Sequence, residues 1–315
     1  MEFLVKKTSE MSQKEKESLV ALFNKVFSKK RSMDEFVNLF EKNDLGYSYF
    51  SIIKNEDGDI VASYAVLPFK YNYFGKEIIF GQSVDTMVRE DYRGNPFNLK
   101  KMANEVYQAL IKEKIPFVFG FPNEEIYMIR KKILKWRDIG KLDIYLTPLS
   151  YNKLLLIPLV KLFNILVNFN NFILDIIFPK KIKNYQVKKN TFSGDELYRK
   201  SNNFFIIRLK NNCSVHCLRY FYKGYKIILI VDLSHLTKQN LKESLFRISK
   251  EEKYSNIIAY IGNLDFRPYS MFKIPKLLNV NNMNLCGKVL IPNMIDESIF
   301  DVANWKINLS NTDFN

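Results

Sequence analysis

An arginine and a glycine stand between an expected strand and an expected helix in the segment Gly81–Leu99, GQSVDTMVREDYRGNPFNL. The strand ends near Arg89, the loop holds Arg93–Asn95, and the helix begins at Pro96, whose missing N–H would have no partner in a first helical turn. A loop that leads into a helix N-terminus presents free backbone N–H groups and a partial positive charge, which suit a phosphate group. The guanidinium of Arg93 adds a charged, forked donor. The segment predicts an anion site, although an ordinary strand-to-helix turn has the same pattern.

This segment resembles the acyl-CoA-binding motif of the GNAT superfamily of N-acetyltransferases, whose signature is Q/R-x-x-G-x-G/A. The resemblance lies in Arg93 and Gly94 and in the hydrophobic helix positions Phe97, Leu99 and Met102. The preceding order of one strand, two helices and three strands also agrees with that family. The resemblance implies a GNAT-like fold with acetyl-CoA as the acyl donor and no metal.

A second stretch agrees with the same family, because Phe119–Asn123 is followed by a helix with Tyr127 and then by Trp136–Gly140. In many GNAT proteins a strand, a helix and an aromatic-rich turn lie in this order after the motif. The resemblance covers about residues 1–147 and rests on order and spacing as much as on residue types.

Two residues depart from the GNAT signature. Asp91 stands where Gln or Arg is usual and brings a repulsive negative charge, and Pro96 stands at the second Gly or Ala and removes one N–H that would face the pyrophosphate. The amides of Asn95, Phe97 and Asn98 are then expected as the remaining donors.

In GNAT enzymes the pantetheine arm lies along the strand before the motif, here about Thr86–Arg89, and backbone amides of that strand polarise the acetyl carbonyl. The cofactor-binding residues that the resemblance implies are Met87, Val88, Arg89, Arg93, Gly94, Asn95, Phe97, Asn98 and Asn123. Asn123 could bond the pantetheine amides, and capping of the helix that starts at Glu124 is an equal alternative.

The resemblance also implies two catalytic residues, because direct transfer needs a base for the ammonium proton and an acid for the departing thiolate. Asp85, on the strand before the motif, is expected to act as the base or to position the substrate, and a solvated or capping aspartate is the alternative. Tyr127 occupies a helix position where GNAT enzymes often keep a tyrosine as the acid, and a packed aromatic is its alternative.

The hydrophobic periodicity predicts the elements that position these residues. Over residues 1–147 it indicates the order β-α-α-β-β-β-α-β-α-β, an α+β fold with a mixed, mostly antiparallel sheet flanked by helices. We expect a GNAT-like acyl-CoA-binding domain over 1–150, an amphipathic helical connector over 151–184, and a second, degenerate GNAT-like domain over 185–315.

The second domain carries no phosphate-loop signature. Its end, Asn304–Asn308 followed by Thr312 and Asp313, is similar to the C-terminal strand of two-domain GNAT-like proteins found with bacterial surface-sugar genes. This similarity implies a domain that shapes the acceptor pocket, and a structural lid is the alternative.

The most apolar stretch of the chain, Leu154–Phe178, predicts a helix over 158–178 that is about 30 Å long. Its polar residues fall on one narrow stripe: Lys161, Asn164, Asn168, Asn171 and Asp175. Five polar residues on one face argue against a solitary transmembrane helix. Packing between the two domains is the favoured interpretation. A helix lying on a membrane beside Lys180, Lys181 and Lys183 and a dimer interface are the alternatives.

Charge and composition narrow the function classes. Lys and Arg total 48 against 33 Asp and Glu, which suits an anionic partner, although a lysine-rich host proteome gives the same excess. No basic helix indicates nucleic acid, and Cys213, His216 and Cys217 lack the second pair that a zinc site needs. Three cysteines and an N-terminus without a long apolar core predict an intracellular protein with free thiols.

These patterns together predict a cytoplasmic acyl-CoA-dependent N-acetyltransferase. The inner face of the membrane is the alternative location, if the 158–178 helix lies on lipid. The expected acceptor is a small primary amine, and an amino sugar on a nucleotide- or lipid-linked carrier in surface polysaccharide biosynthesis is the class that the resemblance favours. The alternative is a catalytically inactive GNAT-like scaffold or binding protein at the membrane surface.

Overall fold

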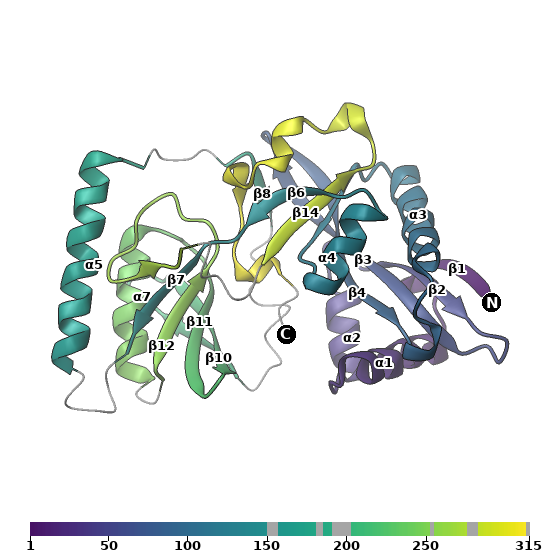
Figure 1. Cartoon of the computed structure of the whole chain (residues 1–315), viewed down its shortest axis with the longest axis horizontal. Coiled ribbons are helices and arrows are strands. Elements are labelled where there is room, and N and C mark those ends of the chain that lie inside the picture. Colours follow the sequence, from purple (N-terminus) through teal and green to yellow (C-terminus); the bar gives the residue numbers. More distant parts are fainter. Residues whose placement is uncertain (150–156, 181–184, 191–202, 253–254, 276–282, 313–315) are drawn as a thin grey trace. The chain divides into compact units, whose positions relative to one another are not determined.

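The computed structural model describes residues 1–149, 157–180, 185–190, 203–252, 255–275 and 283–312. The chain divides into two compact units, and both are discontinuous in sequence (Figure 1). Unit 1 comprises Met1–Lys141, Gln186–Thr191 and Asn282–Trp305. Unit 2 comprises Leu142–Tyr185, Phe192–Asn281 and Lys306–Asn315.

Unit 1 is built on a mixed sheet with the strand order β1-β2-β3-β4-β5-β14-β6, to which β8 and β15 are added beside β3. Its strands are β1 (Glu2–Lys7), β2 (Tyr49–Lys54), β3 (Ile60–Tyr73), β4 (Lys76–Val88), β5 (Phe117–Gly120), β6 (Arg137–Lys141), β8 (Val187–Lys189), β14 (Asn284–Val289) and β15 (Trp305–Lys306). The neighbours β4 and β5 run parallel, and the other pairs along the main order are antiparallel. The predicted order of helices and strands is confirmed up to Lys141, but the last predicted strand, Trp136–Leu146, is divided into β6 and a second strand, Ile144–Pro148, that belongs to the other sheet.

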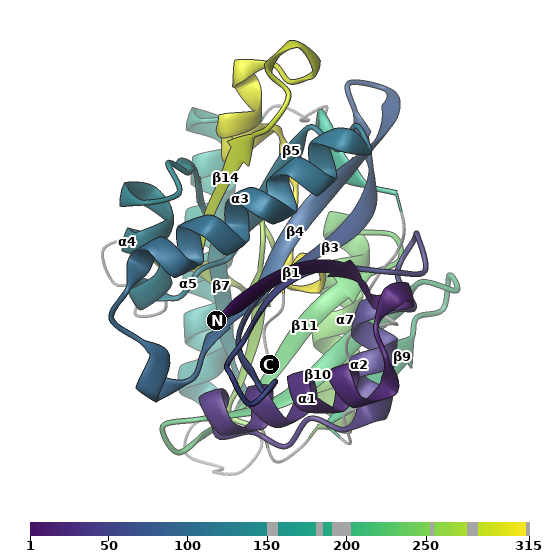
Figure 2. The ribbon, with the colours of Figure 1, turned by 90° about the vertical axis from the view of Figure 1, so that its right-hand side faces the viewer.

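Helices cover both faces of the unit 1 sheet (Figure 2). They are α1 (Gln13–Phe27), α2 (Met33–Phe40), α3 (Pro96–Lys112) and α4 (Glu124–Lys132). Adjacent residues of a strand point to opposite faces. On β2, Tyr49 packs in the core cluster of α3, whereas Phe50 stacks against Phe36 and Phe40 of α2. Both faces of the sheet are therefore buried, which explains the nearly continuous apolar runs in β2 and β3.

Unit 2 has a second mixed sheet with the order β13-β7-β12-β11-β10-β9. Its elements are β7 (Ile144–Pro148), α5 (Ile157–Ile177), β9 (Phe204–Arg208), β10 (Ser214–Tyr222), β11 (Tyr225–Leu233), α7 (Lys238–Glu251), β12 (Ile257–Ile261) and β13 (Phe272–Lys273). The described short 3₁₀ helices of the chain are η1 (Thr8–Glu10), η2 (Glu90–Tyr92), η5 (Pro292–Met294), η6 (Glu297–Phe300), η7 (Val302–Asn304) and η8 (Leu309–Asn311).

The two sheets share a local pattern. In unit 1 the antiparallel strands β2, β3 and β4 lead through α3 to β5, which is parallel to β4, and in unit 2 the strands β9, β10 and β11 lead through α7 to β12, which is parallel to β11. The next strand is antiparallel in both sheets, but β14 of unit 1 comes from the C-terminal part of the chain and β7 of unit 2 from the N-terminal part. This exchange explains why the units differ from the continuous bounds 1–150, 151–184 and 185–315 that we expected.

Candidate active site

The parallel strands β4 and β5 form a fork. They pair at two register positions, Gly81 with Val118 and Gln82 with Phe119. Beyond these positions β4 continues to Val88, and no described strand pairs with the edge that faces β5. An unpaired strand edge presents backbone N–H and C=O groups that a ligand can use.

The hydrogen bonds of β4 show which of its groups face the open edge. The amide of Arg89 donates to the carbonyl of Val61 in β3 at 2.8 Å. Because successive residues of a strand point their backbone groups to opposite edges, the N–H and C=O of Val88 face away from β3. The Val88 carbonyl accepts from Nε of Arg93 at 3.1 Å. This bond brings the expected anion loop against the open edge.

A β-bulge at Asp85 changes the direction of β4. The register between β3 and β4 shifts between Ser63 and Ala65, and Asp85 has a positive φ of 42°, an unusual conformation for a residue other than glycine. Its carboxylate forms an ion pair with the guanidinium of Arg31, and the two side chains are 9% and 7% exposed. Arg31 also lies over the ring of Phe23, with 3.4 Å from Cζ to the ring centroid. The Arg31–Asp85 pair ties the segment before α2 to the strand beside the fork.

The loop before α3 offers fewer free amides than we expected. The amide of Phe97 donates to Oδ1 of Asn95 at 3.0 Å, and the amide of Asn98 donates to the carbonyl of Asn95 at 3.2 Å. The expectation that Phe97 and Asn98 supply free donors is therefore wrong, because Asn95 caps the helix and uses both. Within the described part of the chain, the amides of Gly94 and Asn95 have no assigned acceptor. Gly94 has a φ of 107°, which favours glycine at this position.

Asp91 does not act as an uncompensated charge. Its carboxylate accepts from Nε and Nη2 of Arg89 at 2.8 and 2.9 Å. These hydrogen bonds lower the pKa of Asp91 and raise the pKa of Arg89. The expected repulsion of an anion by Asp91 is thus offset by Arg89, whose own side chain and amide are engaged. Arg93 remains the exposed cation of the loop.

Two further residues that we expected to bind the cofactor have their side chains in contact with the protein instead. Met87 is 1% exposed, so its side chain belongs to the core and its backbone alone is available to a ligand. Asn123 caps α4, because its Oδ1 accepts from the amide of Ile126 at 3.0 Å. Its side-chain amide group has no assigned hydrogen-bond acceptor among the described residues.

Tyr127 lies in an exposed polar cluster on α4. Its hydroxyl donates to Oδ1 of Asp138 at 2.6 Å, and Lys131 contacts both, at 3.4 Å from the hydroxyl and 2.5 Å from Oδ2 of Asp138. Burial and the hydrogen bond to Asp138 raise the pKa of Tyr127. Burial raises the pKa of Asp138, but the bonds from Lys131 and Tyr127 outweigh it and hold that pKa low. Tyr127 therefore keeps its proton at neutral pH, as an acid must.

Sequence reasoning missed Arg130, which lies at the fork itself. The guanidinium is buried, and its Nη2 donates to Oγ of Ser83 at 3.0 Å. Cζ lies 4.6 Å from the ring centroid of Trp136, and Nε and Nη1 have no hydrogen-bond partner in the described part of the chain. A Cβ on Gly120 would meet Nη1 of Arg130 and the Ser83 carbonyl. The glycine therefore leaves room for the guanidinium between the two strands.

The corresponding position in unit 2 is filled by the chain itself. Asn263 donates its amide to the carbonyl of Ile307 at 2.9 Å, which holds the C-terminal segment at the end of β12. At the end of β11, the carboxylate of Asp232 accepts from Asn308 at 2.7 Å and from Ser310 at 2.9 Å. Burial raises the pKa of Asp232. Unit 2 thus has no open fork between these strand ends.

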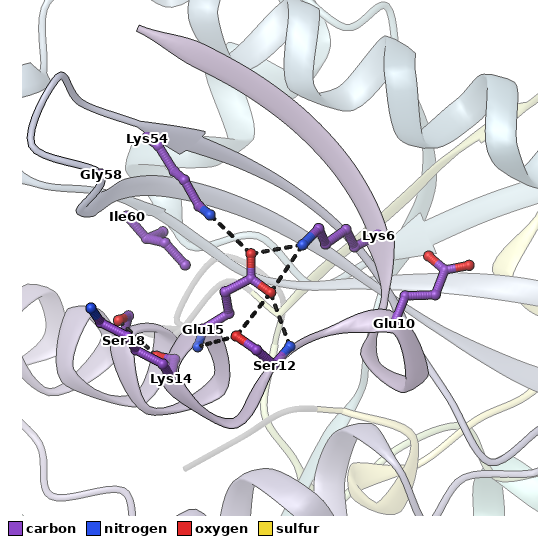
Figure 3. Close-up of a pocket in the computed structure, with 9 residues that line it drawn as sticks. All are labelled: Lys6, Glu10, Ser12, Lys14, Glu15, Ser18, Lys54, Gly58 and Ile60. Atoms are coloured by element: carbon purple, nitrogen blue, oxygen red, sulfur yellow. Dashed lines mark hydrogen bonds and ion pairs between the residues drawn. The ribbon is translucent and has the colours of Figure 1, made fainter.

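Two hollows lie elsewhere on unit 1. One of about 380 Å³ lies along α3 and is lined by Phe97, Lys100, Lys101, Asn104, Glu105 and Gln108. The other, of about 340 Å³, surrounds Glu15, whose carboxylate accepts from Lys6, Lys54 and the amide of Ser12 (Figure 3). Burial works against the ionised carboxylate, but these donors lower the pKa of Glu15 to about 2. Because both lysines are paired with Glu15, we interpret this cluster as structural.

No group of three or more His, Cys, Asp or Glu side chains that could hold a metal ion occurs among the described residues. Cys213, Cys217 and Cys286 are free and buried. His216 lies between the first two on β10, where neighbouring side chains point to opposite faces of the sheet.

Comparison with solved structures shows the fold. The chain is similar to a GCN5-related N-acetyltransferase from Anabaena variabilis, with a TM-score of 0.59 and 11% identity, over 91% of this chain and 73% of that one. It is also similar to a probable N-acyltransferase from Enterococcus faecalis, with a TM-score of 0.56 and 13% identity, over 92% and 73%. For Eis1 from Mycobacterium abscessus the TM-score is 0.54 and the identity 8%, over 92% and 74%.

Comparison with known sequences matches part of the chain to a domain family. None of the curated proteins compared with the chain matches it. Residues 7–132 match the family model of the acetyltransferase (GNAT) domain, a segment that contains β4, the fork, the Arg93–Asn95 loop and α4. Domains of this family use acetyl-CoA as the acyl donor. Residues 7–132 therefore match a GNAT acetyltransferase domain, and the chain is similar in fold to solved N-acetyltransferases.

Proposed function

We propose that the protein transfers an acetyl group from acetyl-CoA to a small primary amine, and that the donor binds at the open edge of β4. The observation that carries this proposal is the fork between β4 and β5 inside the GNAT domain, with the anion loop attached to its edge through Arg93 and Val88. Unit 2 supports it by contrast, because the C-terminal segment fills the equivalent place there.

The residues at this edge fit an elongated anionic ligand. The free amides of Gly94 and Asn95, at the N-terminus of α3, and the exposed guanidinium of Arg93 would hold a phosphate. The N–H of Val88 would donate to a carbonyl that lies along β4. The bound donor supplies an activated acetyl thioester, and this chain supplies the groups that orient it.

The carboxylate of Asp85 would position the amine. Its Oδ2 is engaged by Arg31, and Oδ1 has no hydrogen-bond donor among the described residues. An ammonium group is attracted to such a carboxylate, which orients the amine toward the fork. To act as the base instead, Asp85 would have to accept the ammonium proton on a carboxylate that is already paired with Arg31. We therefore assign substrate positioning to Asp85 ahead of the role of base, and the ammonium group releases its proton to water before the neutral amine attacks.

Tyr127 would act as the acid. Its hydroxyl carries a proton at neutral pH and lies on α4, directly after the end of β5. Release from Asp138 would let it protonate a departing thiolate, and Lys131 would then compensate the charge on Asp138. Asn123, which caps the same helix, would offer its side-chain amide to the donor.

We propose an amino sugar on a nucleotide- or lipid-linked carrier, in surface polysaccharide biosynthesis, as the acceptor class. This choice is supported by the similarity of Asn304–Asn308 to the end of two-domain proteins found with surface-sugar genes. In that assignment unit 2 is a degenerate GNAT-like domain that helps to shape the acceptor pocket. The shared strand order of the two sheets and the filled fork of unit 2 support it. We place the reaction in the cytoplasm, in keeping with three free cysteines.

Acetyl transfer to a panel of amines tests this function. Release of free thiol from acetyl-CoA would be measured with amino sugars, nucleotide-linked amino sugars, polyamines and amino acids as acceptors. We expect turnover with an amino sugar, a higher KM for the amine in Asp85→Asn, and unchanged affinity for acetyl-CoA. Glu77→Gln, a carboxylate change at the opposite end of β4, serves as the control. Turnover with polyamines alone would contradict the acceptor class.

A catalytically inactive scaffold is the second candidate. The observation that favours it is the capping by Asn95, which occupies the amides of Phe97 and Asn98. Pro96 removes a further donor from the same turn. A scaffold of this kind would show no thiol release with any amine, although the protein is folded.

A further inference from the structure

The long helix α5 turns its polar stripe, rather than its apolar arc, toward the rest of unit 2. Asn168 exchanges two hydrogen bonds with Ser270, at 3.1 and 2.6 Å, and Asn171 donates to the carbonyl of Pro268 at 3.0 Å. Asp175 forms ion pairs with Arg267 at 2.6 Å and with a lysine of α7 at 3.2 Å. Polar bonds thus fasten the helix to the folded unit.

The apolar arc of α5 is exposed. Ile165 is 64% and Phe169 is 61% exposed, and Val167 is the large apolar residue of the helix that is buried. The other exposed members of the arc and its end are Leu159, Leu162, Leu166, Phe172, Ile173, Ile176, Ile177 and Phe178. Within unit 2, the described residues leave this arc exposed, and the expected packing between the two domains stays a prediction. A continuous apolar face of this size marks an interaction surface.

By length and composition, Pro158–Ile177 could cross a membrane, with a mean hydropathy of 1.4. The bonds of the polar stripe argue against a spanning orientation. Asp175 is tied to Arg267 and to Lys238 at the start of α7, so insertion across a bilayer would pull folded elements of unit 2 into hydrocarbon. A helix that lies along a surface keeps those bonds and covers its apolar arc.

The charges around α5 suit an anionic surface. Its one acidic residue, Asp175, is neutralised by Arg267 and Lys238. Lys161 on the helix is exposed, as is Lys242 of α7, and neither has an ion pair with a described residue. Lys180, directly after the helix, adds a further cation. Lys181 and Lys183, which we also expected at this surface, lie outside the described residues. Basic residues beside an apolar face are attracted by anionic lipid headgroups.

We propose that α5 binds the surface of an anionic lipid bilayer, with its apolar arc in the boundary between headgroups and acyl chains. The polar stripe holds unit 2 at that surface. This contact is independent of acetyl transfer, because it uses no residue of the β4 fork. It would bring the enzyme to acceptors that are carried on lipid.

A tryptophan placed in the arc would report insertion. The two native tryptophans, Trp136 and Trp305, are buried. The tryptophan fluorescence at longer wavelengths, which comes from exposed side chains, would therefore come from the new residue. Phe169→Trp is the probe, and Phe221→Trp, at a position of unit 2 that is 66% exposed, is the matched control. With vesicles of phosphatidylglycerol and phosphatidylcholine, we expect a blue shift for Phe169→Trp and quenching by brominated acyl chains. Equal behaviour of both variants would overturn the proposal.

Vesicle flotation measures the binding itself. Phe169→Asp should lower the fraction bound to anionic vesicles roughly tenfold, because it puts a charge where an apolar side chain would insert among the acyl chains. The circular dichroism spectrum and the melting temperature should stay unchanged, since position 169 is exposed. Lys161→Gln with Lys242→Gln should weaken binding in low salt, and vesicles of phosphatidylcholine alone should bind little.

Sedimentation velocity distinguishes a second copy of the chain from lipid. A wild-type protein that fails to float, forms a dimer and becomes monomeric in Phe169→Asp would overturn the proposal, because another chain would then cover the arc. A protein that neither floats nor dimerises would overturn it as well. Thiol release by Phe169→Asp with a soluble amine should equal that of the wild type, which separates failure of membrane binding from failure of the proposed catalysis.

Discussion

Replacement of Asp85 by Asn should destabilise unit 1 as well as impair amine binding. Both side chains of the Arg31–Asp85 pair are more than nine-tenths buried. Removal of one partner of a buried ion pair costs about 3–5 kcal/mol, because the other charge is left without compensation. Arg31 keeps its contact with the Phe23 ring, which is worth about 0.5–2 kcal/mol, and Asn can still accept a hydrogen bond. We therefore expect a loss of about 3 kcal/mol.

Urea unfolding followed by tryptophan fluorescence measures this loss in unit 1, because Trp136 and Trp305 both belong to that unit. The melting temperature should fall by roughly 6–12 °C. A double-mutant cycle with Arg31→Gln should show a coupling energy of about 2 kcal/mol or more, since the second substitution removes the charge that the first left unpaired. Arg31→Gln retains the carboxylate and should raise the KM for the amine less than Asp85→Asn.

Two results would refute this reasoning. Additive losses in the cycle would show that the two side chains do not stabilise each other. A variant Asp85→Asn as stable as the wild type, with kcat reduced by a factor on the order of 10² or more and an altered acid limb of the pH profile, would make Asp85 a general base instead.

Further changes give separate tests. Gly120→Ala should lower the free energy of unfolding by about 1–3 kcal/mol and weaken acetyl-CoA binding, because its Cβ would meet the Arg130 guanidinium and lie 2.8 Å from the Ser83 carbonyl. A variant as stable as the wild type in urea unfolding would contradict this. The pKa of Glu15 is lowered to about 2, so its ionised form stabilises the fold above about pH 4.5, and the benefit is lost as the pH falls through 2. Glu15→Gln should therefore remove up to about 3 kcal/mol at pH 6 and less than about 0.5 kcal/mol at pH 2. A constant difference in the unfolding free energy across that range would oppose it. Tyr127→Phe should lower kcat by roughly 10²-fold with unchanged acetyl-CoA affinity. Because the pKa of Tyr127 is raised, the wild-type pH–rate profile should show no decrease from deprotonation of this residue below about pH 10. A decrease near pH 8 that is absent in the variant would argue against the assignment.

Local patterns in the sequence were sufficient for much of unit 1. Alternating and helical periods predict the elements, because each depends on neighbouring residues, and the strand, loop and helix around Arg93 are where they were expected. The exchange of β7 and β14 between sheets was not predictable in this way. β14 pairs with β5 across more than half of the chain, and nothing in the local pattern of either strand selects that partner.

The contacts of the site residues could not be predicted, because their partners are distant in sequence or depend on side-chain conformation. Asp85 was identified as a carboxylate near the fork, but its partner Arg31 is 54 residues away. The sequence does not show that the side chain and carbonyl of Asn95 accept from the amides of Phe97 and Asn98. For α5 the stripe and the arc were visible in the sequence, and the face that meets unit 2 was not. Amide and carboxylate groups of the stripe bond to the chain near Pro268, a contact that periodicity does not reveal.

Calorimetric titration with acetyl-CoA tests the central claim most directly. Arg93→Glu reverses the exposed charge of the anion loop, and Lys76→Glu makes the same change in charge at the far end of β4 as the matched control. We predict that the wild type and Lys76→Glu bind one acetyl-CoA with similar affinity, and that Arg93→Glu binds roughly 100-fold more weakly or without detectable heat. Equal binding by all three proteins, or no binding by the folded wild type, would contradict a donor site at the β4 edge.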